Sequence, residues 1–171
     1  IPEEMPQAIV VEEIEPPTTE DKATDLFNEF RDELGLEESE AEPQGDYETH
    51  YQTATVYYEM GLTDEAVREY QDAINLAKTN DGTRRFFQCA TLLGHCFMEK
   101  GMPNLALTWY QRGLETVGLN EEEKQALNYE IAHAYEIAGE KEKATEYFEK
   151  IYAENIDYRD VSKRLKNLRN Q

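Results

Sequence analysis

The chain has few of the features that mark secreted, membrane or redox proteins. Its 171 residues include only two cysteines, Cys89 and Cys96. Placed on one helix, these two side chains would lie about two turns apart, which is too far for a disulfide. We interpret them as small buried thiols and expect a reducing, cytoplasmic location. No apolar run approaches the roughly 20 residues that a membrane span requires, so we expect no direct membrane contact.

Positive charge is also scarce. Lys and Arg together number 17 against 37 Asp and Glu, which gives a formal net charge of −20. Such a chain repels phosphates, so we expect no nucleic-acid partner. The charge is uneven, because residues 1–45 carry 15 of the acidic side chains and only 2 basic ones. This distribution predicts an acidic tail followed by a folded body.

Catalytic motifs are missing as well. Serine occurs only at Ser39 and Ser162, and the sequence holds no P-loop, no glycine-rich dinucleotide turn and no Cys-x-x-Cys motif. Paired carboxylates are so frequent that no single pair is informative. We therefore predict that the protein is not an enzyme and that it binds no cofactor and no metal.

The first 45 residues divide into three pieces. Residues 1–18 are rich in proline and glutamate, and the prolines exclude a long helix, so we expect an extended or flexible segment. Residues 19–34 are predicted to form an amphipathic helix, and residues 35–45 an acidic linker. The apolar stripe of that helix consists of Leu26, Phe27, Phe30 and Leu34.

From residue 46 onward, one residue pattern returns three times. An aromatic residue is followed four positions later by glycine, then by alanine, a second aromatic and usually a small residue. The glycine is expected to end a helix in a left-handed conformation, and the alanine to let a second helix pack closely. Each pair exposes an apolar face that only a neighbouring pair covers, so pairs must stack. The occurrences are Tyr57, Gly61, Ala66, Tyr70 and Ala73; Phe97, Gly101, Ala106, Tyr110 and Gly113; and Tyr135, Gly139, Ala144, Phe148 and Ile151.

These segments resemble tetratricopeptide repeats, the middle one most closely because Leu93-Gly94 precedes its pattern. The repeats follow one another after 40 and then 38 residues, against about 34 in the family, and lack the closing proline. The resemblance implies an all-α fold, a right-handed superhelical stack of three helix pairs with a C-terminal capping helix and an additional N-terminal helix. The implied limits are 46–157 for the repeats (about 46–79, 83–117 and 121–154) and 158–171 for the cap.

The last helix is amphipathic. Val161, Leu165 and Leu168 are predicted to face inward, as a terminal cap requires. Two interpretations of its polar face stay open: a solvated capping surface, or a basic docking site for an acidic partner. The cations predicted to face outward are Arg159, Lys163, Arg164, Lys166 and Arg169.

The resemblance also implies that the first helix of each pair lines a concave groove that binds a peptide. A surface rich in Tyr and Met is typical of interfaces. We expect a neutral or basic partner with apolar anchors, because Glu59, Glu99 and Glu136 would repel an acidic one. The predicted partner-binding residues are Tyr51, Thr55, Tyr58, Glu59, Gln88, Thr91, His95, Met98, Tyr129, His133 and Glu136.

One family subtype is disfavoured. Chaperone-adaptor repeats hold a C-terminal carboxylate with cationic and amide side chains in this groove. The matching positions here carry no cation; they are Tyr51, Thr55, Leu92, Ala126 and Glu130.

Two histidines occupy the same place in successive repeats, which raises a metal hypothesis. His95, His133 and Glu136 supply suitable ligand types. Matching positions on adjacent helices lie about 9–10 Å apart, however, and two imidazoles do not easily bridge that distance. We therefore favour histidines that line the groove.

The sequence thus predicts a protein–protein interaction scaffold that binds a peptide or helix of its partner. The alternative is a structural, self-association or spacer module within a longer protein. In that case residues 1–34 would dock in cis or in trans, with residues 19–34 covering the first pair or lying in the groove.

Overall fold

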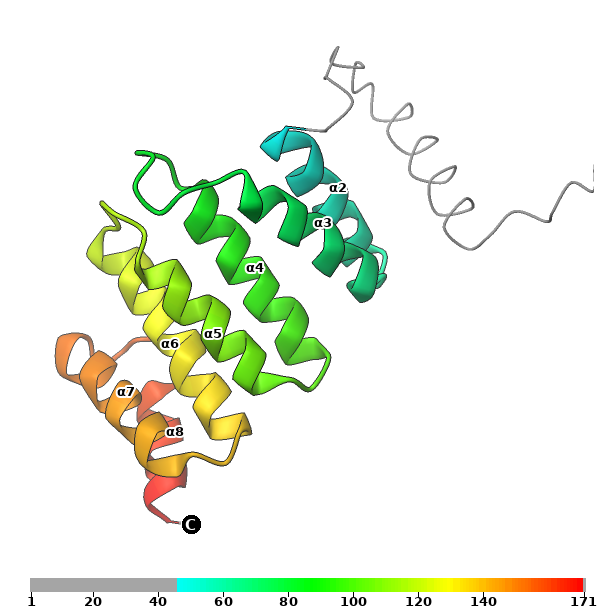
Figure 1. Cartoon of the computed structure of the whole chain (residues 1–171). Helices are drawn as coiled ribbons and strands as arrows, with labels where there is room; N and C mark the ends of the chain where they lie inside the picture. The colour runs from blue at the N-terminus through cyan, green and yellow to red at the C-terminus, as the bar shows by residue number, and fades with distance from the viewer. Residues whose placement is uncertain (1–45, 171) are drawn as a thin grey trace, which may run out of the picture. The chain divides into compact units, whose positions relative to one another are not determined.

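The computed structural model describes residues 46–170, and this part of the chain forms seven helices and no strand (Figure 1). This confirms the predicted all-α fold. The helix predicted over residues 19–34 lies outside the described residues. None of the helices from α2 to α8 is long and apolar enough to cross a membrane. They are α2 (Tyr47–Glu59), α3 (Thr63–Asn75), α4 (Arg85–Glu99), α5 (Pro103–Leu114), α6 (Glu121–Ile137), α7 (Lys141–Glu154) and α8 (Val161–Arg169).

The helices pair in chain order, α2 with α3, α4 with α5 and α6 with α7, and each pair contacts the next. A glycine ends the first helix of every pair. Gly61, Gly101 and Gly139 take φ values of 75°, 69° and 81°, a left-handed region that is costly for other residues. The next N–H then closes a six-residue turn, as in the 2.8 Å bond from Met102 to the Phe97 carbonyl. These turns confirm the predicted helix ends.

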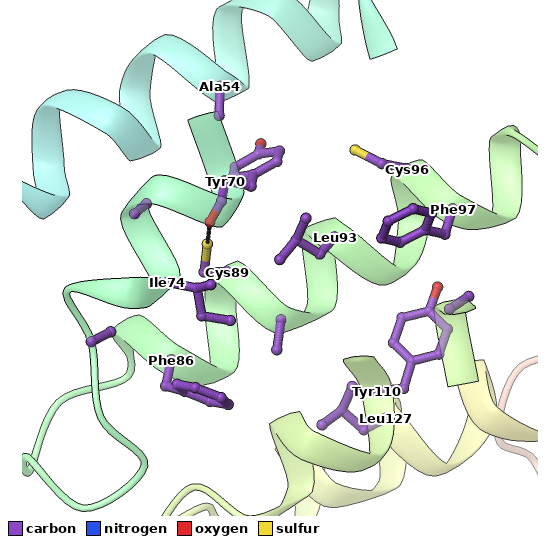
Figure 2. Packing of buried hydrophobic residues seen from close by; sticks show 14 of the residues in the cluster. Ala54, Tyr70, Ile74, Phe86, Cys89, Leu93, Cys96, Phe97, Tyr110 and Leu127 are labelled. Atoms are coloured by element: carbon purple, nitrogen blue, oxygen red, sulfur yellow. Dashed lines mark hydrogen bonds between the residues drawn. The ribbon is translucent and has the colours of Figure 1, made fainter. Parts of the chain in front are cut away.

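Small residues set the spacing within each pair. Ala66, Ala106 and Ala144 are fully buried, as the repeat pattern predicted. In the second pair, the α-carbon of Gly94 lies against the ring of Tyr110, which is also fully buried. Figure 2 shows this ring rising from α5 towards α4. The helices therefore cross closely where the sequence supplies little or no side chain.

Stacking between pairs depends on three apolar residues, spaced i, i+4 and i+7 on a first helix. Cys89, on α4, lies beside Ile74 and donates its thiol hydrogen to the Tyr70 carbonyl of α3 (Figure 2). Leu127, on α6, lies beneath Gly113 of α5. The buried stacking triplets are Cys89, Leu93 and Cys96 on α4; Leu127, Ile131 and Ala134 on α6; and Val161, Leu165 and Leu168 on α8.

Helix α8 continues this stack. Its triplet follows that of α6 at the 34-residue spacing of an ordinary repeat, and it packs on α7 as α4 packs on α3. At the other end, the matching residues of α2 are not apolar and buried: Thr49 is exposed, while Thr53 and Val56 are half-buried. Within residues 46–170, α2 thus lacks a buried apolar triplet, whereas α8 takes the place of a fourth first helix.

Local sequence fixes where the helices begin. Asn120 accepts a hydrogen bond from the Glu123 N–H, and the Glu123 carboxylate accepts one from the Asn120 N–H, each at 2.8 Å. This reciprocal cap confirms the predicted start of α6. Glu123 also binds the Arg84 guanidinium at 2.8 Å and so ties α6 to the residue before α4. The connections between the pairs, which make these repeats longer than about 34 residues, therefore take part in contacts between helices.

Candidate functional site

The candidate site is the surface formed by the first helices, α2, α4 and α6, here called the first-helix face. Its predicted members on α2 and α4 lie at or near the surface. Glu59 and Gln88 are exposed. The half-buried members, which present part of their side chains to solvent, are Tyr51, Thr55, Tyr58, Thr91, His95 and Met98.

Polar contacts run across this face from helix to helix. The Tyr58 hydroxyl on α2 donates to the Glu99 carboxylate on α4. His95 on α4 has its Nε2 atom 3.9 Å from a carboxylate oxygen of Glu130 on α6. Glu130 in turn accepts a 3.0 Å hydrogen bond from Arg159, which precedes α8. The sequence did not indicate the roles of Glu130 and Arg159, since their partners lie 29 or more residues away.

The predicted site residue Tyr129, on α6, is covered by the segment that precedes α8. Tyr129 is only 8% exposed and donates a 2.6 Å hydrogen bond to Asp160. The Arg159 guanidinium lies 4.4 Å from the centre of the Tyr129 ring. Tyr129 therefore supports the docking of this segment and presents little surface to a partner.

His133 and Glu136 are engaged in the same way. The Arg164 guanidinium contacts His133 Nδ1 at 3.0 Å and forms an ion pair with Glu136. The prediction that Arg164 faces outward is wrong, because its side chain is half-buried and reaches from α8 to His133 and Glu136 on α6. Lys163, Lys166 and Arg169 are exposed, as predicted.

Arg159 is exposed, as predicted, but it also makes contacts with α6. Its backbone adopts a left-handed conformation with φ 43°, which costs free energy for a residue with a side chain. Its contacts with Tyr129 and Glu130 offset that cost. Arg159 and Arg164 thus neutralise the α6 end of the first-helix face and are not a free basic docking site.

Burial and neighbouring charges shift the pKa values of two side chains on this face. Burial lowers the pKa of His95 below its ordinary value, although the carboxylates of Glu130 and Glu99 act in the opposite direction. Burial also raises the pKa of Tyr58, and its hydrogen bond to Glu99 adds to the effect. At neutral pH both groups are therefore uncharged, and Tyr58 is a hydrogen-bond donor.

The metal hypothesis for His95, His133 and Glu136 gains no support. Within residues 46–170, these three do not bring ligand atoms together. The group that does so is His50, Glu69 and Asp72, on α2 and α3. There, His50 Nδ1 lies 2.7 Å from a Glu69 oxygen, which is the distance of an ordinary hydrogen bond. Sequence reasoning missed this group, because His50 lies on α2 while Glu69 and Asp72 lie on α3.

Comparisons with known proteins identify the architecture. A tetratricopeptide repeat family model matches residues 47–80 and 126–154. The middle pair, whose sequence most resembles the family, is not matched. No curated protein matches the chain.

Solved structures share the fold at low sequence identity. The crystal structure of MamA superposes with a TM-score of 0.61 at 16% identity, covering 90% of this chain and 84% of that one. The first TPR of Spaghetti (RPAP3), bound to HSP90 peptide SRMEEVD, gives 0.60 at 12% identity, covering 76% and 94%. The Arabidopsis OM64 TPR domain gives 0.59 at 15% identity, covering 73% and 95%. Together with the family-model match to residues 47–80 and 126–154, these structures identify the stacked helix pairs as tetratricopeptide repeats.

Proposed function

We propose that the protein is a non-catalytic protein–protein interaction scaffold that binds a peptide or helix of its partner on the first-helix face. The observation that carries the proposal is the kind of side chain on this face. Tyr58, His95 and Met98 are half-buried there. Aromatic and methionine side chains are enriched in interfaces, whereas a merely solvated helix face is richer in Lys and Glu.

The binding surface is centred on α2 and α4. On α6, Tyr129 is buried and Arg164 engages both His133 and Glu136. A partner would have to displace these contacts in order to use the third helix fully. Tyr58 and Met98 are therefore the anchors on which most of the affinity should depend.

The expected partner is neutral or basic. Among residues 46–170, Glu59 and Glu99 have no Lys or Arg within ion-pair distance, and each ends its helix. The negative end of each helix dipole adds to their charge. The neighbouring Spaghetti structure was solved with an acidic peptide, but no cation stands at the clamp positions of the present chain. We therefore expect this protein not to retain that peptide.

Selection from a peptide-display library on the immobilised full chain tests the proposal. Recovered peptides should lose affinity when Tyr58→Ala and Met98→Ala are combined, because hot-spot anchors cost about 2 kcal/mol or more when truncated, or roughly thirtyfold in Kd. Leu105→Ala is the matched control, since Leu105 is 43% exposed on the second helix α5. Affinity unchanged in the double variant, with helicity intact, would exclude this face.

A further inference from the structure

The buried aromatic residue of the second helix differs between the three pairs in whether it has a hydroxyl and whether that hydroxyl is hydrogen-bonded. In the first pair, the Tyr70 hydroxyl bonds to Thr55 at 3.1 Å. In the third pair, the matching residue is Phe148, which has no hydroxyl. In the second pair, the fully buried Tyr110 has a hydroxyl without a hydrogen-bond partner. Burying an unpaired hydroxyl costs about 1–3 kcal/mol. The third pair has phenylalanine at the matching position, so the fold does not require a hydroxyl there. A function of the Tyr110 hydroxyl would explain why it is present.

The Tyr110 ring contacts a member of the first-helix face. The ring makes an edge contact with His95, with 5.9 Å between ring centres. Burial raises the pKa of Tyr110, and next in effect are the Glu130 carboxylate and Tyr58. These side chains belong to α6 and α2, so first helices of all three pairs contribute to the surroundings of Tyr110. His95, whose ring contacts Tyr110, is itself half-buried.

Two carboxylates lie near His95: Glu99 one helical turn further along α4, and Glu130 on α6. Glu99 accepts a hydrogen bond from the uncharged Tyr58 hydroxyl, and within residues 46–170 no Lys or Arg forms an ion pair with it. Glu130 has Arg159 on one oxygen at 3.0 Å. Its other oxygen is 3.9 Å from His95, too far for a hydrogen bond. One oxygen of Glu130 therefore has spare acceptor capacity, as does Glu99.

We propose that Glu99, Glu130 and the Tyr110 hydroxyl form a subsite for an arginine side chain of the bound peptide. This inference rests on the proposed function and names one chemical feature of the partner. A guanidinium has five N–H donors in a planar fork and so binds two carboxylates and a phenol oxygen together. The incoming cation takes the place of His95 beside Glu130, and the imidazole swings outward and uncovers the Tyr110 hydroxyl. The aromatic ring of Tyr58 flanks the cation.

The test is an NMR titration of the full chain, labelled with ¹⁵N, with N-acetyl-arginine amide. The neutral isostere N-acetyl-citrulline amide is the matched control. We expect saturable shifts at Tyr58, His95, Glu99 and Glu130 with arginine and none with citrulline. Shifts spread evenly over the acidic surface, or equal shifts with both compounds, would overturn the subsite.

Point variants test which side chains bind the arginine. Glu99→Gln should abolish the saturable shifts, whereas Glu122→Gln, an exposed position on α6, should leave them unchanged. Tyr110→Phe should weaken the arginine shifts without lowering Tm, because it removes only an unpaired hydroxyl. Arginine shifts that survive both Glu99→Gln and Tyr110→Phe would refute the subsite. If the displayed peptides still depend on Tyr58 and Met98 in that case, the proposed function stands and only the arginine subsite is lost.

Discussion

Replacing Gly94 by alanine should destabilise the protein, although alanine is the better helix former. Gly94 lies inside α4, where the helix propensity of alanine favours it by about 1 kcal/mol. A β-carbon at this position would come within 2.1 Å of a Tyr110 ring carbon and within 2.5 Å of a second. Carbon atoms pack at about 3.5–4.0 Å, so the ring would have to move by more than 1 Å.

The ring has little room for such a movement. Tyr110 is fully buried, and His95 lies against its edge. Overpacking of a core costs about 1–3 kcal/mol, and the severity of this overlap points to the upper end. After the propensity gain is subtracted, Gly94→Ala should lower the free energy of unfolding by about 2 kcal/mol, or Tm by about 8 °C.

Gly113→Ala is a matched control for the same exchange. It is also a buried glycine within a helix, but its added β-carbon would lie 3.2 Å from Leu127 and 3.4 Å from Ala90. A shift of a few tenths of an ångström suffices there, so the propensity gain should roughly cancel the cost. Both variants are measured by urea unfolding followed by circular dichroism.

A double-mutant cycle assigns the cause. In a Tyr110→Leu background the clashing ring atoms are gone, so the added cost of Gly94→Ala should largely disappear. A Gly94→Ala variant as stable as the parent protein would refute the reasoning. So would a cost that persists undiminished in the Tyr110→Leu background.

Three further predictions concern other parts of the stack. Ala106→Leu should cost about 1–3 kcal/mol in thermal unfolding, because the position is fully buried at a helix crossing; an unchanged Tm would contradict the crossing. Asn120→Ala should cost about 1 kcal/mol through loss of the α6 cap, seen as a lower urea midpoint. Burial raises the pKa of Asp160, but hydrogen bonds from Tyr129 and Arg164 outweigh it, so this pKa is lowered on folding. Its stabilisation is therefore present above the unfolded pKa of about 3.9 and lost as the pH falls through the folded value, so Asp160→Asn should lose less Tm than the parent protein between pH 5 and pH 3.

The sequence predicted those features that depend on residues close together in the chain. Gly61 and its counterparts end the first helices, Asn120 begins α6, and Val161 faces inward on α8. Each of these follows from a local rule, either of helix capping or of helical periodicity. Three occurrences in register made the repeat pattern visible even though no single copy matches the family in full.

Contacts between neighbouring first helices could not be predicted in this way. Periodicity indicates which face of a helix is buried, but it does not say which neighbour covers each edge of that face. The sequence therefore predicts that Tyr129 contacts a partner, although the segment before α8 covers it, and that Arg164 faces solvent, although it binds Glu136. These contacts join residues about 30 positions apart, so they depend on how the pairs stack.

The helices at the two ends of the described stack, α2 and α8, differ in the residues through which a first helix packs on the helix before it. A first helix packs on the helix before it through a triplet spaced i, i+4 and i+7, and the triplet is apolar wherever such a helix precedes it. In α8 the triplet is buried, so this helix extends the stack and its polar residues reach α6. In α2 the triplet begins with Thr49 and Thr53, which tolerate water. Hydroxyl groups at these two positions make the stacking edge of α2 less apolar than those of α4, α6 and α8.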